Sequence, residues 1–290
     1  MEFDVGHCGI QRIGRAATGA VVAAVAMLAG AALSDPVRAQ GRLDARYEAY
    51  LAGIPVGKGT WAIEIADDQY SATATGGTSG LMKAFSGGHG SGATQGRVVN
   101  GQLAPSNYLA TLASDTKQAE TIRILLAGGN IKESTIEPEP EPNPDRLPVT
   151  EAHRKGVIDP MTGSLIHVAG TADPIGPDAC GSTASIFDGR MRYDLKLAFK
   201  RLESVKAKGY QGPVAVCALY FAPISGYVPE RAAIKYLAAQ RNMEVWLAPI
   251  AGTRVLVPFK VLVPTPIGMA ALEATQFVST ALVRTTAKTQ

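Results

Sequence analysis

The side chains that could do chemistry are concentrated in one stretch, SIFDGRMRYDLKLAF at residues 185–199. Two carboxylates and three cations lie close together there, and paired carboxylates can act as general acid and base when their environments hold their pKa values apart. Their spacing favours a strand instead. Apolar residues take the odd positions and charges the even ones, a period of two that is typical of a strand with one buried and one solvated face. We therefore predict one candidate interaction face, made of Asp188, Arg190, Arg192, Asp194 and Lys196.

Catalytic and cofactor motifs are absent from the sequence. It contains no GxSxG, no P-loop, no HExxH and no GxGxxG. The glycine-rich stretch around His89 lacks the Lys and Ser/Thr that end a phosphate-binding loop. We therefore assign no catalytic, cofactor-binding or metal residues. One alternative stays open, an unrecognised hydrolase whose candidate residues would be Asp188, Asp194 and His167.

The N-terminus has the order of parts of a secretory signal peptide. Arg12 and Arg15 precede an apolar run over residues 16–33, and a short polar stretch follows with the small residue Ala39 at its end. The alternative is an uncleaved anchor, but the uninterrupted run is shorter than the roughly 20 residues that span a bilayer. We predict that residues 1–39 are removed and that the mature chain is not transmembrane.

Two cysteines remain after that cleavage, because Cys8 lies in the removed segment. In an oxidising compartment, Cys180 and Cys217 most simply form a disulfide bond, which would constrain the unfolded chain by roughly 3 to 4 kcal/mol. A nucleophilic cysteine or a metal pair are the alternatives. Neither cysteine has a CxxC partner, and the four histidines do not lie near them at ligand spacing.

Length and charge place limits on the remaining chain, residues 40–290. About 250 residues suit one large all-β domain. The net charge of the whole chain is +3 and no run of Lys or Arg occurs, so we predict no nucleic-acid partner. Nothing in the sequence indicates the oligomeric state.

Alternation of apolar and polar residues predicts antiparallel strands along most of residues 40–290. A hairpin turns at residues 53–59, a third strand follows, and two more strands flank a turn at Gly128–Asn130. Glycine recurs so often over residues 80–108 that we expect only short strands and loops there. Four prolines over residues 138–145 stop regular structure and predict a crossover loop near 138–148.

The second half of the chain combines strands with two expected helices. Asp159 and Pro160 are typical of a helix start, and Gly170 would end that helix. A second helix is expected over residues 229–241. Apolar residues on both faces predict a central strand over 212–226, and prolines interrupt the strands expected after 243. The fold class is therefore mainly β, a curved antiparallel sheet or partly closed β-barrel (half-barrel) with a few short helices.

Several linked motifs of the chain resemble the domain-of-unknown-function family 3108, exported proteins of Gram-negative bacteria. They are YEAYLAGIPVGKGTWAIEI, GVIDPMTG, IFDGRMRYDL, VCALYFAPISGY and VWLAP, and the resemblance covers about residues 45–280. The resemblance implies export to the periplasm, mainly antiparallel β-structure, and a cysteine pair at Cys180 and Cys217. It implies no catalytic residues.

The absence of a chemical constellation, together with export, points to a non-enzymatic protein of the cell envelope. We expect it to bind an apolar, lipid-like ligand or envelope component between the concave face of the sheet and the helices expected near 160–170 and 229–241. The alternative is an envelope assembly or protein-interaction factor that uses the charged face at Asp188–Lys196.

Overall fold

The computed structural model describes residues 40–79, 87–114 and 117–282, and these form one antiparallel sheet of fourteen strands. The predicted segment 1–39 lies outside the described residues. The strands of the first half are β1 (Gly41–Leu51), β2 (Ile54–Ile65), β3 (Gln69–Thr78), β4 (Gly88–Val99), β5 (Gln102–Ser114), β6 (Lys117–Ala127) and β7 (Asn130–Glu137). Those of the second half are β8 (Ile166–His167), β9 (Thr183–Phe187), β10 (Arg192–Ala207), β11 (Tyr210–Ser225), β12 (Glu244–Pro249), β13 (Val255–Thr265) and β14 (Gly268–Ala281).

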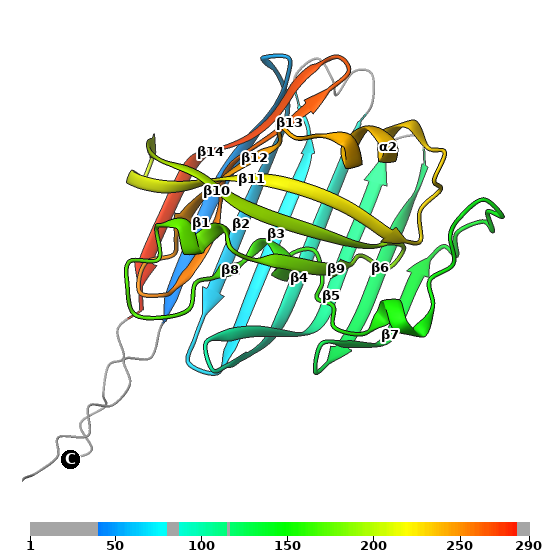
Figure 1. The fold of residues 1–290 in the computed structure, drawn as a ribbon, viewed down its shortest axis with the longest axis horizontal. Helices are drawn as coiled ribbons and strands as arrows, with labels where there is room; N and C mark the ends of the chain where they lie inside the picture. The colour runs from blue at the N-terminus through cyan, green and yellow to red at the C-terminus, as the bar shows by residue number, and fades with distance from the viewer. Residues whose placement is uncertain (1–39, 80–86, 115–116, 283–290) are drawn as a thin grey trace, which may run out of the picture. The chain divides into compact units, whose positions relative to one another are not determined.

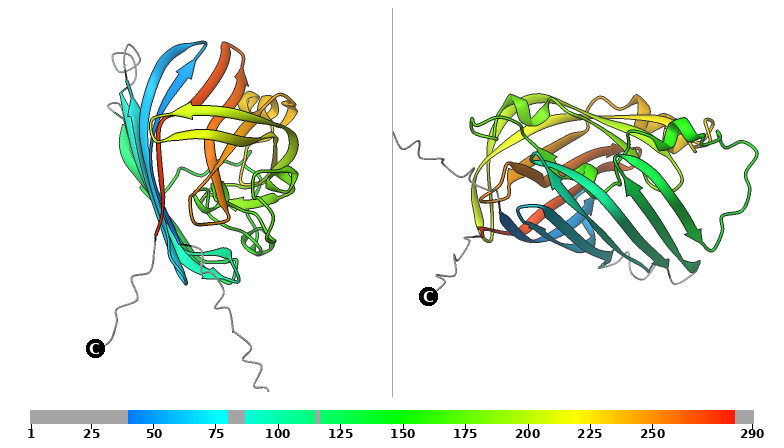
Figure 2. Two further views of the ribbon diagram at one scale, coloured as in Figure 1. Left: turned by 90° about the vertical axis from the view of Figure 1, so that its left-hand side faces the viewer. Right: turned by 90° about the horizontal axis from the view of Figure 1, so that it is seen from below.

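The two halves of the chain form the two halves of the sheet, which meet where β1 pairs with β14. From one edge to the other the sheet runs β7-β6-β5-β4-β3-β2-β1-β14-β13-β12-β11-β10-β9, and β8 pairs with β13 beside this path. The second half then turns over the first, so that β10 and β11 cross in front of β2 to β6 (Figure 1). Seen from the side and from below, the halves form two layers (Figure 2). The prediction of a curved antiparallel sheet is confirmed.

The main core lies where the two layers face each other. Leu43, Ile63 and Tyr70 of the first layer pack in one cluster with Val214 and Val216 of the second. The alternate residues of β11, Ala215 and Cys217, belong to a different cluster on the opposite face of that strand. Strand β11 is thus buried on both sides, as its apolar sequence predicts.

A connecting segment, residues 155–167, crosses between the layers and is called the strap below. At its start, Val157 donates its backbone N–H to Gly129 O at 2.8 Å, and Ile158 donates to Ser185 O at 2.9 Å. The strap therefore bridges the β6–β7 turn and the edge strand β9. At its end, β8 pairs with Val255 and Leu256 of β13. The strap thus ties three distant parts of the sheet together.

Several element predictions are confirmed with adjusted bounds. The β1–β2 hairpin, strand β3, and the strands around the turn at Gly128–Gly129 are present. The expected second helix is α2 (Ala232–Ala239). Residues 138–150 have no regular structure apart from a short turn, and Leu147 exchanges backbone hydrogen bonds with Gly226 and Tyr227.

Three element predictions are wrong. The helix expected from Asp159 to Gly170 is a single 3-10 turn, Thr162–Ser164, followed by β8, because the chain here pairs with β13 instead of coiling. The glycine-rich region contains the twelve-residue strand β4, whose neighbours on both sides supply its hydrogen bonds. The stretch 187–199 is not one strand, since a turn at residues 188–191 separates β9 from β10.

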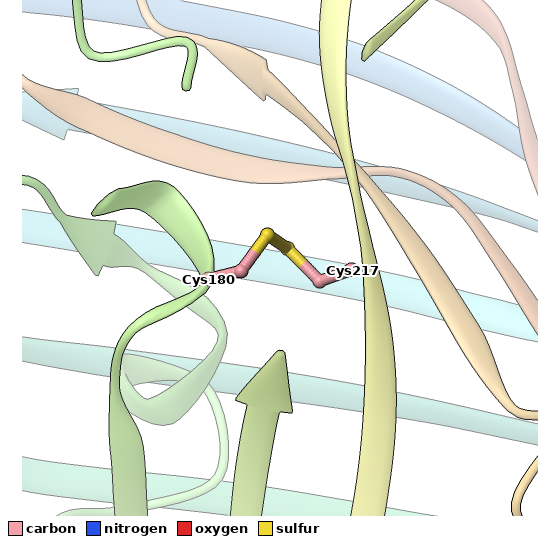
Figure 3. The surroundings of a disulfide bond; sticks show 2 residues. All are labelled: Cys180 and Cys217. Atoms are coloured by element: carbon pink, nitrogen blue, oxygen red, sulfur yellow. A yellow bond between two sulfur atoms is a disulfide. The ribbon is translucent and has the colours of Figure 1, made fainter. Parts of the chain in front are cut away.

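The structure contains the disulfide bond between Cys180 and Cys217 (Figure 3). Cys180 ends the 3-10 turn Pro177–Cys180, and Cys217 lies in the middle of β11, with 5.6 Å between their Cα atoms. Both are buried, in the cluster that also contains Val168, Ala179 and Leu247. The bond therefore fixes the segment after the strap against the outer face of β11.

Replacing both cysteines with alanine should lower the free energy of unfolding. The bond closes a loop with a sequence separation of 37, so the loop-entropy relation gives a loss of about 3 to 4 kcal/mol. Urea unfolding of the double variant measures it, and the reduced wild-type protein is the control. An unchanged unfolding midpoint in both would contradict the prediction.

Candidate functional site

An apolar groove of about 450 Å³ opens beside the inner face of β1, β2 and β3. Its volume is in the range of small-molecule sites. Residues of β13, β14 and the strap complete the lining. The described residues that line it are Tyr47, Ala49, Gly57, Lys58, Gly59, Thr60, Trp61, Ala74, Thr75, Gly76, Gly77, Ser164, Pro258, Val261 and Leu272.

The groove lies where several inward positions of the neighbouring strands are glycine or alanine. Deeper in the core, the inner face of β2 and β3 bears Ile63, Ile65 and Tyr70, which are 1–2% exposed. Toward the other end of these strands the same alternation places Gly59 and Gly76 inward. A Cβ built on Gly76 would meet a single neighbouring atom, Lys58 O at 3.6 Å, so there is room for a larger side chain.

Two aromatic residues, Tyr47 and Trp61, form part of the groove wall. The Tyr47 hydroxyl donates to Pro258 O at 2.7 Å, so that its hydrogen-bonding need is met. Burial raises the pKa of Tyr47, which keeps the hydroxyl neutral. The indole Nε1 of Trp61 is buried and has no hydrogen-bond partner among the described residues. Trp61 therefore contributes its ring to the groove wall, while its N–H group is covered by neighbouring atoms of the chain.

A buried polar cluster around Asp159 holds the strap next to the groove. Asp159 Oδ1 accepts the backbone N–H groups of Met161 and Thr162, each at 3.0 Å. Its Oδ2 accepts the hydroxyls of Thr162 at 2.6 Å and of Thr94, on β4, at 3.0 Å. The Tyr70 hydroxyl lies 2.7 Å from Thr162 Oγ1. The predicted capping role of Asp159 is confirmed, but it caps one 3-10 turn.

The environment of Asp159 indicates a structural role and not a catalytic one. Asp159 is fully buried, and this burial raises the pKa of its carboxyl group, against four hydrogen bonds that lower it. All four donors come from the chain itself, and so the carboxylate has no free face for a substrate. Its function is to position the strap, including Ser164, at the groove.

The residues of the predicted interaction face are divided among different surroundings. Asp188 and Arg190 lie in the β9–β10 turn, where Asp188 Oδ1 accepts the backbone N–H groups of Arg190 and Met191 at 2.8 and 2.7 Å. Burial raises the pKa of Asp188. The Arg190 side chain forms an ion pair with Glu120 of β6, and so the β9–β10 turn contacts the first layer.

The other three members of that face do lie together on β10. Arg192 pairs with Asp194 at 2.7 Å, and Asp194 also accepts the Ser185 hydroxyl at 2.9 Å. Lys196 is exposed. The single five-residue face is therefore a strand face of three residues next to a turn of two, and its role in interactions stays a prediction.

The hydrolase candidates are not assembled into a site. His167 Nδ1 lies 3.1 Å from Gln102 Nε2, and burial and the nearby Arg254 lower its pKa. Within the described ranges, no hydrogen bond or ion pair joins any two of His167, Asp188 and Asp194. The same ranges contain no cluster of three His, Cys, Asp or Glu residues suited to a metal ion. Among the helices described, none is long and apolar enough to cross a membrane.

The sequence did not locate the groove, and the prediction that the helix over residues 229–241 forms one of its walls is wrong. Helix α2 does not line the groove; it borders a separate hollow with Tyr220 and Phe221 of β11. The signal that could have located the groove is the phase of the glycines, since those at residues 57, 59, 76, 90 and 92 all fall on inward positions of their strands. The high glycine content of residues 80–108 suggested loops there and so concealed the alternation.

Replacing Asp159 with alanine should cost about 3 kcal/mol of folding free energy, because it leaves two backbone N–H groups, one buried and one partly buried, without an acceptor. Denaturant unfolding measures the loss. Asp173→Ala is the control, because Asp173 also accepts a backbone N–H, that of Ile175 at 2.8 Å, but at an exposed site. The two variants should differ by at least about 2 kcal/mol; equal losses would show that the buried cluster has no special importance.

Comparison with known proteins places the chain in a family. Its fold is similar to the crystal structure of a beta-barrel-like protein of domain of unknown function DUF1849 from Brucella abortus, with 11% identity, a TM-score of 0.46, and coverage of 83% of this chain and 97% of that chain. No curated protein matches the sequence significantly. The profile of the family described as "Protein of unknown function (DUF3108)" matches residues 46–275. Since that match covers most of the sequence, the chain belongs to the DUF3108 family.

Proposed function

We propose that this protein is a non-enzymatic carrier or receptor of the bacterial cell envelope that binds a lipid-like chain in the groove beside β1, β2 and β3. The observation that carries the proposal is the groove's floor of glycine and alanine. A folded-over sheet normally fills its interior with side chains, and here the groove lined by Gly57, Gly59, Ala74 and Gly76 is not filled by any of the residues that the structure describes.

The chemistry of the lining favours an apolar chain. Pro258, Val261 and Leu272 add apolar side chains to the lining beside the glycines, and burying an alkyl chain there is favourable by about 0.8 kcal/mol per methylene group. A fatty acyl chain has this apolar character.

Filling the groove should weaken binding. Gly76→Leu places a side chain in open space within the groove, and we expect it to weaken binding of a fatty acid at least about tenfold, equivalent to about 1.4 kcal/mol. Binding is read from quenching of Trp61 by a brominated fatty acid in the Trp246→Phe background, where Trp61 is the only tryptophan. Native mass spectrometry without detergent would identify any lipid that copurifies.

The matched control is Gly176→Leu, because a Cβ at Gly176 meets nothing within 4 Å and the residue lies outside the groove. It should bind the fatty acid as the wild-type protein does. If both leucine variants quench like wild type, or if no fatty acid quenches Trp61 at all, the proposed function is wrong.

Export of the chain is the second part of the proposal. Its support is the basic and apolar order of residues 1–39. Expression from the complete gene in a Gram-negative host should yield a periplasmic protein whose N-terminal sequence starts near Gln40. Recovery of an intact Met1 terminus from the cytoplasm would contradict export.

A further inference from the structure

The distal ends of two neighbouring hairpins form an uncharged surface next to the groove. We call it the apolar tip; it comprises residues 49–57 around the β1–β2 turn and residues 261–272 around the β13–β14 turn. Neither range contains a charged residue. The two turns are in contact, because Ala52 donates its backbone N–H to Met269 O at 2.9 Å. They lie side by side in two views (Figures 1 and 2).

Large apolar side chains of the tip are open to solvent. Ile267 is 71% exposed, Ile54 is 55% exposed and Met269 is 41% exposed. Exposed contiguous apolar surface on a protein marks a binding surface for a membrane or another macromolecule. Pro55, Pro264 and Pro266 have no backbone N–H group. A strand of another protein would therefore find few hydrogen-bond donors on the tip.

A row of charges crosses all four strands immediately below the tip. Glu48 of β1 pairs in register with both Lys58 of β2 and Glu273 of β14, and Glu273 pairs in register with Lys260 of β13. The ion pairs Lys58–Glu48 and Lys260–Glu273 measure 2.9 and 3.0 Å. The charge boundary is therefore level across the four strands, as a flat lipid surface requires.

The dimensions also fit a lipid surface. From Glu48 to the turn at Ala52 and Gly53 the strand advances about 15 Å at roughly 3.3 Å per residue, which is about half the thickness of a bilayer's hydrocarbon core, about 30 Å. An uncharged tip of this length with a level ionic boundary can enter one leaflet without burying a charge.

The groove opens into the tip. Ala49, Gly57, Val261 and Leu272 belong both to the tip and to the lining of the groove. We propose that the apolar tip docks on a lipid bilayer and that the groove takes up its acyl chain directly from the leaflet. The proposal rests on the proposed function of the groove and adds the source of its ligand.

The test is flotation of the purified protein with vesicles of phosphatidylethanolamine and phosphatidylglycerol. Ile267→Glu and Ile54→Glu should each lower the vesicle-bound fraction at least about fivefold, because each places a charge beyond the ionic row. Leu202→Glu is the control, since Leu202 is 52% exposed on β10, away from the tip. It should leave binding unchanged.

Salt concentration separates tip insertion from electrostatic adsorption. Binding through an uncharged tip should change less than about twofold between low salt and about 0.5 M salt, whereas adsorption of surface lysines would be lost. Loss of wild-type binding at high salt, equal binding by the tip variants, or equal loss in Leu202→Glu would each overturn the proposal. Conversion of a wild-type dimer to a monomer by Ile267→Glu would overturn it in favour of self-association.

Failure of this proposal can be distinguished from failure of the proposed function. Ile267→Glu should still show Trp61 quenching by a brominated fatty acid added from solution, while Gly76→Leu should lose that quenching and keep its vesicle binding. Retained quenching in Gly76→Leu refutes the groove, and retained flotation in Ile267→Glu refutes the tip. Circular dichroism confirms that each variant is folded.

Discussion

The hydrogen bonds of one buried carboxylate, Asp159, determine how the two layers of the sheet are joined. The carboxylate accepts two backbone N–H groups of the strap and the hydroxyls of Thr94 and Thr162. A buried charge is tolerated only when such donors surround it. Because its partners lie on the strap and on β4, the strap cannot shift along the sheet without losing them. The bridge to β9, the pairing with β13 and the position of Ser164 all follow from this attachment.

Side-chain volume on the inner face of the sheet explains why the interior is full in one place and open in another. Where β2 and β3 carry Ile63 and Tyr70, the layers meet in a dense core. Where the same strands carry Gly59 and Gly76, the described side chains leave the volume of the groove free. Glycine weakens a strand, so its repetition at these positions has a local cost in stability, which the long pairing of β1 to β4 offsets.

The sequence allowed the sheet to be predicted because strand alternation is local. In β1, the buried residues Leu43, Ala45 and Tyr47 alternate with more exposed ones, and in β2 Ile63 and Ile65 alternate with the exposed Glu64. The helix after Asp159 could not be distinguished from a 3-10 turn, since the same cap and proline start both, and the pairing partner that decides between them is in β13, about 90 residues away. The turn at Asp188 was hidden for a related reason: Asp188 and Gly189 continued the alternation by coincidence. The groove depends on the packing of two layers and has no local signal apart from the phase of the glycines.

The two ends of the described chain meet at one point. Leu282 donates its backbone N–H to Gln40 O at 3.1 Å, and from there β1 and β14 run side by side to the β1–β2 and β13–β14 turns. The domain is thus close to circular in its connectivity, an arrangement that tolerates circular permutation and insertion into other proteins. A fusion partner attached next to Gln40 or Leu282 would be separated from the apolar tip by the full length of β1. If the protein were immobilised on a surface through the same point, the β1–β2 and β13–β14 turns would remain accessible.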